Sequence, residues 1–174
     1  MGSVEKLKQD YENKKPKIKE RLNQFQKFFN EPYSWFYRNG ELVLLPVEMK
    51  DDCRIFEELA FCIFTANTSA EMGAKAVDSV RHGLISGNPF DMTRRLEGIY
   101  RFNNLRPKFI VHTRNYLKNT LNFRLKDRII SFNNKDDLRN FFALNKDIKG
   151  IGLKEASHFL RNIGYENLAI IDFH

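Results

Sequence analysis

Apolar residues recur at helical spacing along most of the chain. Over residues 4–29 they follow one another at steps of three, four or seven, which predicts an amphipathic helix that Pro16 splits or kinks. Residues 55–63 are apolar on nearly every side and predict a buried helix. Residues 67–69, Asn-Thr-Ser, are typical of a helix start and predict a helix over 70–80. The chain is therefore expected to be mainly α.

The pattern predicts three further helices and one β element. Helices are expected over residues 92–99, through 109–117 and over 138–144. The last of these should bury Leu138, Phe141, Phe142 and Leu144. Asn39-Gly40 stands between two β-prone runs and is a strong signal for a tight hairpin turn. A small β-hairpin is therefore expected within an otherwise helical chain.

Two glycines one residue apart, Gly150 and Gly152, separate the last two helical patterns. Glycine tolerates positive φ and lets another backbone approach closely. The following helix should end at Gly164, and its core stripe should comprise Leu153, Ala156, Phe159, Leu160 and Ile163. Such a hairpin brings backbone N–H groups to a helix N-terminus, where the dipole favours a phosphate, and Lys149 adds charge beside it. The alternative is a plain turn between helices, with glycines present for steric reasons.

Composition narrows the class of partner. The 174 residues carry a net charge of +7, and the pI is near 9.4. A basic excess of this size favours a polyanionic partner, because phosphate contacts release counterions. No apolar run is long enough to predict a membrane span. Cys53 and Cys62 have no neighbours of the kind that a zinc or iron–sulfur site needs, so free, buried thiols in an intracellular protein are expected.

One stretch of the sequence resembles a known family. Residues 148–164, Ile-Lys-Gly-Ile-Gly-Leu-Lys-Glu-Ala-Ser-His-Phe-Leu-Arg-Asn-Ile-Gly, and then Ala-Ile-Ile-Asp at 169–172, resemble the signature of the second 8-oxoguanine DNA glycosylase/AP lyase family, best known from archaea. That family belongs to the helix-hairpin-helix superfamily of DNA glycosylases. Residues 61–71 and 101–110 resemble two further segments of it. The resemblance implies a two-lobe helical fold with a cleft between the lobes.

The resemblance also implies a division of the chain. Residues 1–60 would form an N-terminal helical lobe, and residues 61–164 a second lobe that carries the helix-hairpin-helix. Residues 165–174 would return toward the first lobe and carry Asp172, and in the family the residues after Asp172 join that lobe.

The sequence departs from the family pattern in three places. The hairpin near Asn39-Gly40 is longer than the usual connection there. Phe173 stands where a basic residue is common. The family continues through further helices after the position of His174, so two alternatives are open: the chain is a fragment, or the remaining C-terminal segment lies on another chain.

The catalytic residues of the family map onto Lys154 and Asp172. The Lys154 amine would attack C1′ of the damaged nucleotide, expel the base and form a Schiff base that permits β-elimination. Asp172 follows an apolar run and is placed to cap a helix, and its carboxylate would stabilise positive charge on the sugar. Without the resemblance, Lys154 would be interpreted as an ordinary solvated lysine and Asp172 as a cap alone.

Further residues are candidates for DNA contacts. Lys149, Gly150 and Gly152 would hold a phosphate. An enzyme that flips a base must fill the vacated stack. Asn67 is the candidate for contact with the orphaned partner base and Phe102 for the wedge, with a core role as the alternative for Phe102, one of 16 phenylalanines.

The resulting hypothesis is a bifunctional base-excision repair enzyme. It would act as a monomer inside the cell on double-stranded DNA containing 8-oxoguanine, with no metal, cofactor or membrane. His112 and His158 lack metal-like spacing and are expected to be ordinary structural or surface histidines. Two alternatives remain: a helix-hairpin-helix DNA-binding module without chemistry, which has no use for a lysine–aspartate pair, and a sister glycosylase with a different lesion.

Overall fold

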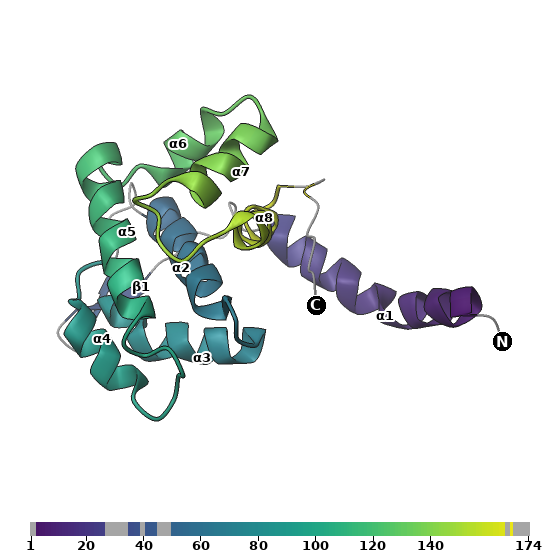
Figure 1. Cartoon of the computed structure of the whole chain (residues 1–174), viewed down its shortest axis with the longest axis horizontal. Coiled ribbons are helices and arrows are strands. Elements are labelled where there is room, and N and C mark those ends of the chain that lie inside the picture. Colours follow the sequence, from purple (N-terminus) through teal and green to yellow (C-terminus); the bar gives the residue numbers. More distant parts are fainter. Residues whose placement is uncertain (1–2, 27–34, 39–40, 45–49, 166–167, 169–174) are drawn as a thin grey trace.

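The computed structural model describes residues 3–26, 35–38, 41–44, 50–165 and 168. These residues form a mainly helical structure in which several helices pack around α2 (Lys50–Thr65), together with a two-stranded sheet (Figure 1). The described helices are α1 (Ser3–Gln26), α2 (Lys50–Thr65), α3 (Ala70–Val80), the short 3-10 helix η2 (Arg81–Gly83), α4 (Pro89–Leu96), α5 (Arg106–Leu121), α6 (Leu125–Ile130), α7 (Lys135–Leu144) and α8 (Leu153–Asn162). The prediction of a mainly helical chain is confirmed.

Helix α1 projects away from the other helices (Figure 1). Pro16 lies inside this continuous helix, so of the two predicted effects a split into two helices is wrong, and a kink stays a prediction. Val4, Leu7 and Tyr11, which begin the apolar stripe predicted from the sequence, are all exposed. No described element packs over the stripe at this end. The spacing of apolar residues predicts a helix, but it does not predict whether another element covers the apolar face.

Strands β1 (Trp35–Arg38) and β2 (Glu41–Leu44) pair antiparallel, with Trp35 opposite Leu44 and Arg38 opposite Glu41. The two residues between the strands, at which the turn is predicted, lie outside the described residues. Strand β1 lies against η2. The expectation that this hairpin is longer than the family's usual connection stays a prediction.

Helix α2 is the centre of the fold. It contacts α3, α5, α6 and α8, and Ile55, Phe56 and Ile63 are completely buried within it. A helix covered on most sides by other helices must be apolar around most of its circumference, as the sequence predicts. The predicted boundary between two lobes, at residues 60 and 61, falls inside α2. The division into two lobes stays a prediction.

Capping residues fix where α3 and α4 begin. The Ser69 side chain accepts a hydrogen bond from the Met72 N–H at 3.1 Å, which confirms the predicted cap of α3. Asn88 does the same for the Asp91 N–H at 2.9 Å, and Pro89 takes the first helical position, where its missing N–H costs nothing. Helix α4 therefore begins earlier than the predicted 92–99 and ends at Leu96.

The last two helices pack on each other and bury most of their predicted stripes. The rings of Phe142 in α7 and Phe159 in α8 meet edge to face, with centroids 4.7 Å apart. Two expectations are wrong, because Leu144 is 67% exposed and Leu153 is 49% exposed. Both lie at the helix ends that flank the hairpin, beyond the edge of the core.

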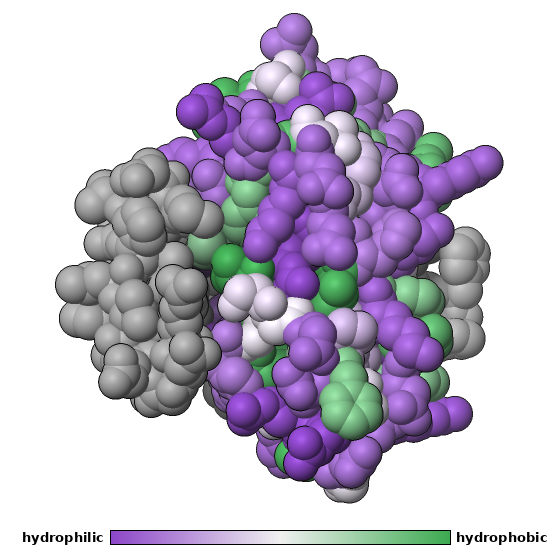
Figure 2. Space-filling view, turned by 90° about the vertical axis from the view of Figure 1, so that its left-hand side faces the viewer, coloured by the Kyte–Doolittle hydropathy of each residue, from purple (hydrophilic) through white to green (hydrophobic). Residues whose placement is uncertain are grey.

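The side of the molecule that carries α4 and α5 is predominantly hydrophilic, with small hydrophobic areas (Figure 2).

Cys53 and Cys62 are both free and buried, as predicted. Burial raises the pKa of the Cys53 thiol to about 12, so this sulfur stays protonated and unreactive. None of the helices in the described part of the chain combines the length and apolar character that a membrane span requires.

Candidate active site

A tight hairpin connects α7 to α8. Asn145 opens it by accepting a hydrogen bond from the Asp147 N–H at 2.9 Å. Ile148 and Ile151 are buried and anchor the hairpin in the core. Gly150 lies between them with φ +79°, a left-handed conformation that residues with a Cβ rarely adopt. The backbone conformation of the turn therefore requires glycine at position 150.

The hairpin docks on α5 through polar contacts. The Lys149 N–H donates to the Thr113 hydroxyl at 2.9 Å, and Thr113 is completely buried. The Asn145 side-chain amide donates to the Tyr116 hydroxyl at 2.9 Å. These bonds hold the backbone of the hairpin at a fixed place on α5, and they leave the Lys149 side chain half exposed.

Helix α8 begins directly after the hairpin, and its ends are well defined. The Gly152 N–H donates to the Glu155 carboxylate at 3.1 Å, so this backbone donor already has a partner within the protein. At the other end, Gly164 has φ +101° and the Tyr165 N–H donates to the Leu160 carbonyl at 2.9 Å. This is a Schellman motif, and it confirms the predicted helix end at Gly164.

A pocket of about 610 Å³ opens between α8 and the turn that follows α2. Lys154, on the first turn of α8, is half buried and lines it. Asn67 lines the opposite side from the α2–α3 turn. The structure thus brings two sequence-predicted site residues into one pocket. Its lining residues are Phe61, Cys62, Thr65, Asn67, Thr68, Ala70, Lys154, Glu155, His158, Arg161 and Asn162.

His158 and Arg161 also line the pocket, and the sequence reasoning did not assign either of them to the site. The Arg161 guanidinium lies 3.1 Å from Nδ1 of His158. Since a guanidinium can only donate, Nδ1 accepts, and a neutral His158 ring carries its proton on Nε2. His158 is four residues after Lys154 and therefore shares its helix face, a spacing from which the sequence could have indicated this neighbour.

The turn that carries Asn67 is held in an uncommon backbone conformation. Asn67 itself is exposed and has φ +62°, which asparagine tolerates better than most residues. The Thr68 hydroxyl donates to the Phe64 carbonyl at 2.8 Å, and the Tyr100 hydroxyl donates to the same carbonyl. The exposed amide therefore sits on a rigid support.

Phe102 lies outside the pocket. It is half buried, and its ring centroid is 6.1 Å from that of Tyr100. The guanidinium carbons of Arg101 and Arg106 lie 5.0 and 5.4 Å from the ring centroid. Phe102 is thus packed among side chains near the Asn67 turn, and its role as a wedge stays a prediction.

Of the remaining predicted residues, the structure describes His112 but not Asp172. His112 is exposed and lies 3.4 Å from Asp147, on the outer side of the hairpin. Asp172 lies outside the described residues, so its place relative to Lys154 stays a prediction. Among the described residues, no group of three or more His, Cys, Asp or Glu side chains is arranged to hold a metal ion.

Two helices joined by a glycine hairpin, with a lysine at the head of the second helix, define a helix-hairpin-helix protein. The family described as 8-oxoguanine DNA glycosylase matches residues 45–174. The 8-oxoguanine DNA glycosylase/AP lyase of Korarchaeum cryptofilum is 40% identical over 126 residues, which are 72% of this chain and 57% of that protein. The enzyme of the same name from Methanocaldococcus jannaschii is 42% identical over 120 residues, 68% of this chain and 54% of that protein. The chain belongs to the 8-oxoguanine DNA glycosylase family.

Solved structures agree with this assignment. The M. jannaschii 8-oxoguanine glycosylase/lyase, crystallised with a 15mer DNA containing 8-oxoguanine, has a TM-score of 0.73 and 32% identity, covering 95% of this chain and 69% of that one. The 8-oxoguanine DNA glycosylase of Thermotoga maritima also has a TM-score of 0.73, with 31% identity over 98% of this chain and 69% of that one. The matched part of this chain spans a little over half the length of the curated relatives.

Proposed function

We propose that this protein removes 8-oxoguanine from double-stranded DNA and cleaves the resulting abasic strand, with Lys154 as nucleophile. The observation that carries the proposal is the position of Lys154 at the head of α8, lining a pocket that Asn67 borders from the other side. Family membership supplies the substrate class, since the matched relatives are named 8-oxoguanine DNA glycosylase/AP lyase.

The proposed reaction begins at the nitrogen of Lys154. Its lone pair forms a bond to C1′ of the flipped nucleotide while the C1′–N9 bond breaks, and the base leaves with that electron pair and takes up a proton. Opening of the sugar then gives an imine between Lys154 and C1′. Loss of a C2′ proton breaks the C3′–O bond, and the phosphate departs with the electron pair. Water finally hydrolyses the imine and releases the enzyme.

Other residues have supporting roles in the proposal. Asp172 stabilises positive charge that develops on the sugar, a role that rests on its match to the family signature. Lys149 and the backbone around Gly150 and Gly152 hold a phosphate of the bound strand; because the Gly152 N–H already donates to Glu155, the other backbone donors carry more of this contact. Asn67 contacts the orphaned base, and Phe102 supports the vacated stack.

The proposal extends to the assembly. We infer that the lobe of residues 1–60 and the lobe of residues 61–164 flank the bound DNA, and that one copy of the chain binds one duplex inside the cell. The basic net charge of +7 supports a DNA partner, because each neutralised phosphate releases counterions.

The nucleophile is tested by Lys154→Gln, which removes the amine and keeps a polar side chain of similar length. Borohydride should trap wild-type protein on a duplex with 8-oxoguanine, because it reduces the imine to a stable amine. Lys154→Gln should form no trapped complex and release no base, yet still bind the duplex.

The matched control is Lys135→Gln, which changes an exposed lysine at the start of α7 that does not line the pocket. It should trap like the wild type. Undiminished trapping in Lys154→Gln would overturn the assignment of the nucleophile. Wild-type binding to the lesion duplex without any trapping would favour a DNA-binding module without chemistry.

Asp172→Asn tests the carboxylate, because it keeps the size of the side chain and its ability to cap a helix. Loss of one preorganised electrostatic group typically lowers the rate by about 10²–10³-fold. Single-turnover base release should slow to this extent, whereas cleavage at a preformed abasic site should slow less, since no base is expelled there. An equal loss on both substrates with a large drop in Tm would make Asp172 a structural cap.

A further inference from the structure

The middle of the hairpin between α7 and α8 is where backbone donors remain for a phosphate. Several other N–H groups of the hairpin already donate within the protein, to Asn145, Thr113 and Glu155. Within the described part of the chain, no acceptor is paired with the N–H groups of Gly150 and Ile151. These two groups are therefore the backbone donors left for the phosphate contact that the proposed function assigns to the hairpin.

Asp147 places a negative charge three residues before Gly150. Its N–H donates to the Asn145 side chain at 2.9 Å, which fixes the backbone of Asp147 at the start of the hairpin. Its side chain is 56% exposed and is therefore able to change direction. A carboxylate close to a bound phosphate repels it. The direction of the Asp147 side chain should therefore affect how strongly the hairpin binds DNA.

His112 of α5 faces this carboxylate. Its Nε2 lies 3.4 Å from Oδ1 of Asp147. The next residue of α5, Thr113, accepts the hydrogen bond from the Lys149 N–H, so α5 and the hairpin are fixed against each other at this point. A protonated imidazole attracts a carboxylate through its full charge, and a neutral imidazole attracts it much less. The position of the carboxylate therefore depends on the charge of His112.

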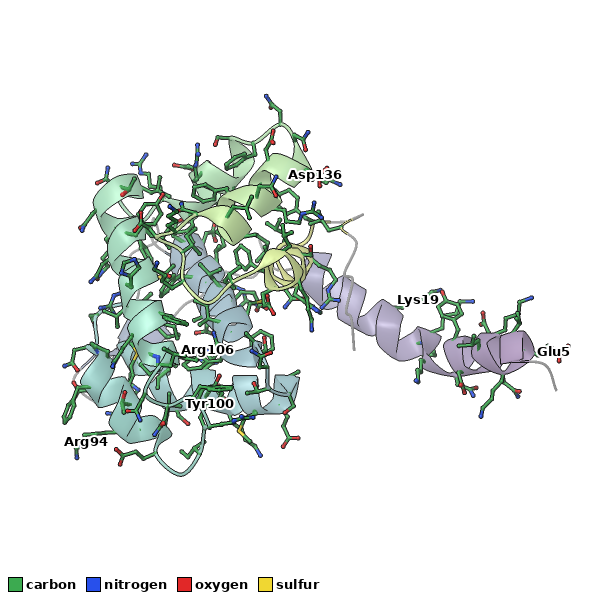
Figure 3. The ribbon with its side chains drawn as sticks, viewed as in Figure 1. Glu5, Lys19, Arg94, Tyr100, Arg106 and Asp136 are labelled. Carbon is green, nitrogen blue, oxygen red and sulfur yellow. The ribbon has the colours of Figure 1, made fainter. Side chains whose placement is uncertain are left out.

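Several other charged side chains surround this pair. Arg106, beside Tyr100 at the start of α5, lies against the hairpin backbone, and its Nη2 donates to the Ala66 carbonyl at 3.0 Å (Figure 3). Lys108 lies one turn before His112 on α5. The other charged residues of the hairpin and of the first turn of α8 near it are Lys146, Lys149 and Glu155. Among these residue types, only histidine ordinarily changes its charge between about pH 5 and pH 8.

We propose that His112 is a positioning residue for the DNA-binding hairpin. When protonated, it holds the Asp147 carboxylate on the outer side of the hairpin, away from the bound phosphate, so the affinity for DNA rises as the pH falls. This inference rests on the proposed function. The direction follows from linkage: if DNA binds more tightly when His112 is protonated, then DNA binding favours protonation of His112 by the same factor. The gain in affinity is therefore complete at low pH and is lost as the pH rises through the titration of His112.

The test measures the affinity of the full chain for an undamaged duplex by fluorescence anisotropy, at constant ionic strength and between about pH 5 and pH 8. An undamaged duplex has no lesion to be excised, and phosphate contacts do not depend on sequence. His112→Gln keeps a polar side chain that cannot gain a proton in this range, and Asp147→Asn removes the charge but keeps the shape. The control is His82→Gln, which removes a half-buried histidine from η2, an element outside the hairpin.

The wild type and His82→Gln should bind about two- to fivefold more tightly at the low end of this range than at the high end, the effect of one charge interaction near the surface. His112→Gln should lose this response and keep the weaker affinity throughout. Asp147→Asn should bind tightly at every pH, because no carboxylate is left to repel the phosphate. The double variant should behave like Asp147→Asn, since His112 acts through Asp147.

An undiminished pH response in His112→Gln overturns the inference, because another group then takes up the proton. A full response in Asp147→Asn also overturns it, because His112 would then meet the phosphate directly. In both cases the proposed function stands. Failure of the wild type to bind either an undamaged or a lesion duplex overturns the proposed function, and the inference with it. Both side chains are about half exposed, so neither change should unfold the protein, which a thermal melt checks.

Discussion

Gly150 and Gly98 share a left-handed backbone conformation but differ in how closely other side chains approach them. Both have a positive φ, +79° and +70°. A Cβ at Gly98 would meet nothing within 4 Å, whereas one at Gly150 would meet Phe109 and Arg106 at less than 3 Å. A side chain at Gly98 would therefore cost backbone strain alone, whereas a side chain at Gly150 would add a steric clash.

Replacing each of these glycines with alanine should give unequal losses of stability. Gly98→Ala should lower the free energy of unfolding by about 1–2 kcal/mol, the cost of a left-handed conformation for a residue with a Cβ. Gly150→Ala should lower it by a further 1–3 kcal/mol or so, because the core around the hairpin must shift. Urea denaturation of both variants measures the difference. Equal losses would mean that the Arg106 and Phe109 side chains yield without cost.

At the scale of elements, the hairpin depends on one face of α5. Arg106, Phe109, Thr113 and Tyr116 follow one another at steps of three and four, so they lie on the same side of the helix. Each of them meets the hairpin between α7 and α8. The helix-hairpin-helix is therefore a unit of three helices, with α5 as its platform.

Substitutions of Thr113, which accepts the hydrogen bond from the Lys149 N–H, test whether α5 holds the hairpin in place. Thr113→Val keeps the shape but removes the acceptor, which leaves the Lys149 N–H without its partner and should cost about 1–3 kcal/mol of unfolding free energy. Thr113→Ser keeps the acceptor and should retain the bond. Hydrogen exchange at the Lys149 amide should accelerate in the valine variant and stay slow in the serine variant. Equal protection in both would show that the hairpin is held by its other contacts.

Elements with local signals could be predicted from the sequence. Ser69 and Gly164 mark helix ends through their own backbone chemistry, so these two boundaries were predictable. Helix α6 was not predicted, because six residues are too few to establish a helical period. Leu153 and Leu144 follow the apolar pattern yet are exposed, because burial depends on which elements pack nearby.

The residues of the candidate site also differ in how far the sequence could predict them. The resemblance led to Lys154 and Asn67, which the structure brings into one pocket. Arg106 had no local signal, since arginine is rarely buried and its contacts join segments far apart in the chain. His158 was set aside because it lacked metal-like spacing, and its closeness to Lys154 follows from the helix alone.

At the scale of the whole molecule, the net charge of +7 should control binding to DNA. Phosphates are neutralised wherever basic side chains meet the backbone of the duplex, and each contact adds about 0.9 to the slope of log K against log salt. This contribution is independent of sequence, so lesion-containing and undamaged duplexes should show nearly the same slope. Their affinities should differ by an offset that salt does not change.

Lys149→Ala should reduce this slope by about 0.9, because the half-exposed side chain beside the hairpin would lose one phosphate contact. The control is Lys135→Ala, which removes the same charge from an exposed position at the start of α7. If net charge alone governed binding, both variants would weaken it equally, so the pair separates a local contact from the general field. Binding is measured by fluorescence anisotropy on lesion and undamaged duplexes across a range of salt concentrations. A Lys149→Ala slope equal to that of the wild type would place the phosphate contact elsewhere, and an equal reduction in both variants would assign the effect to net charge.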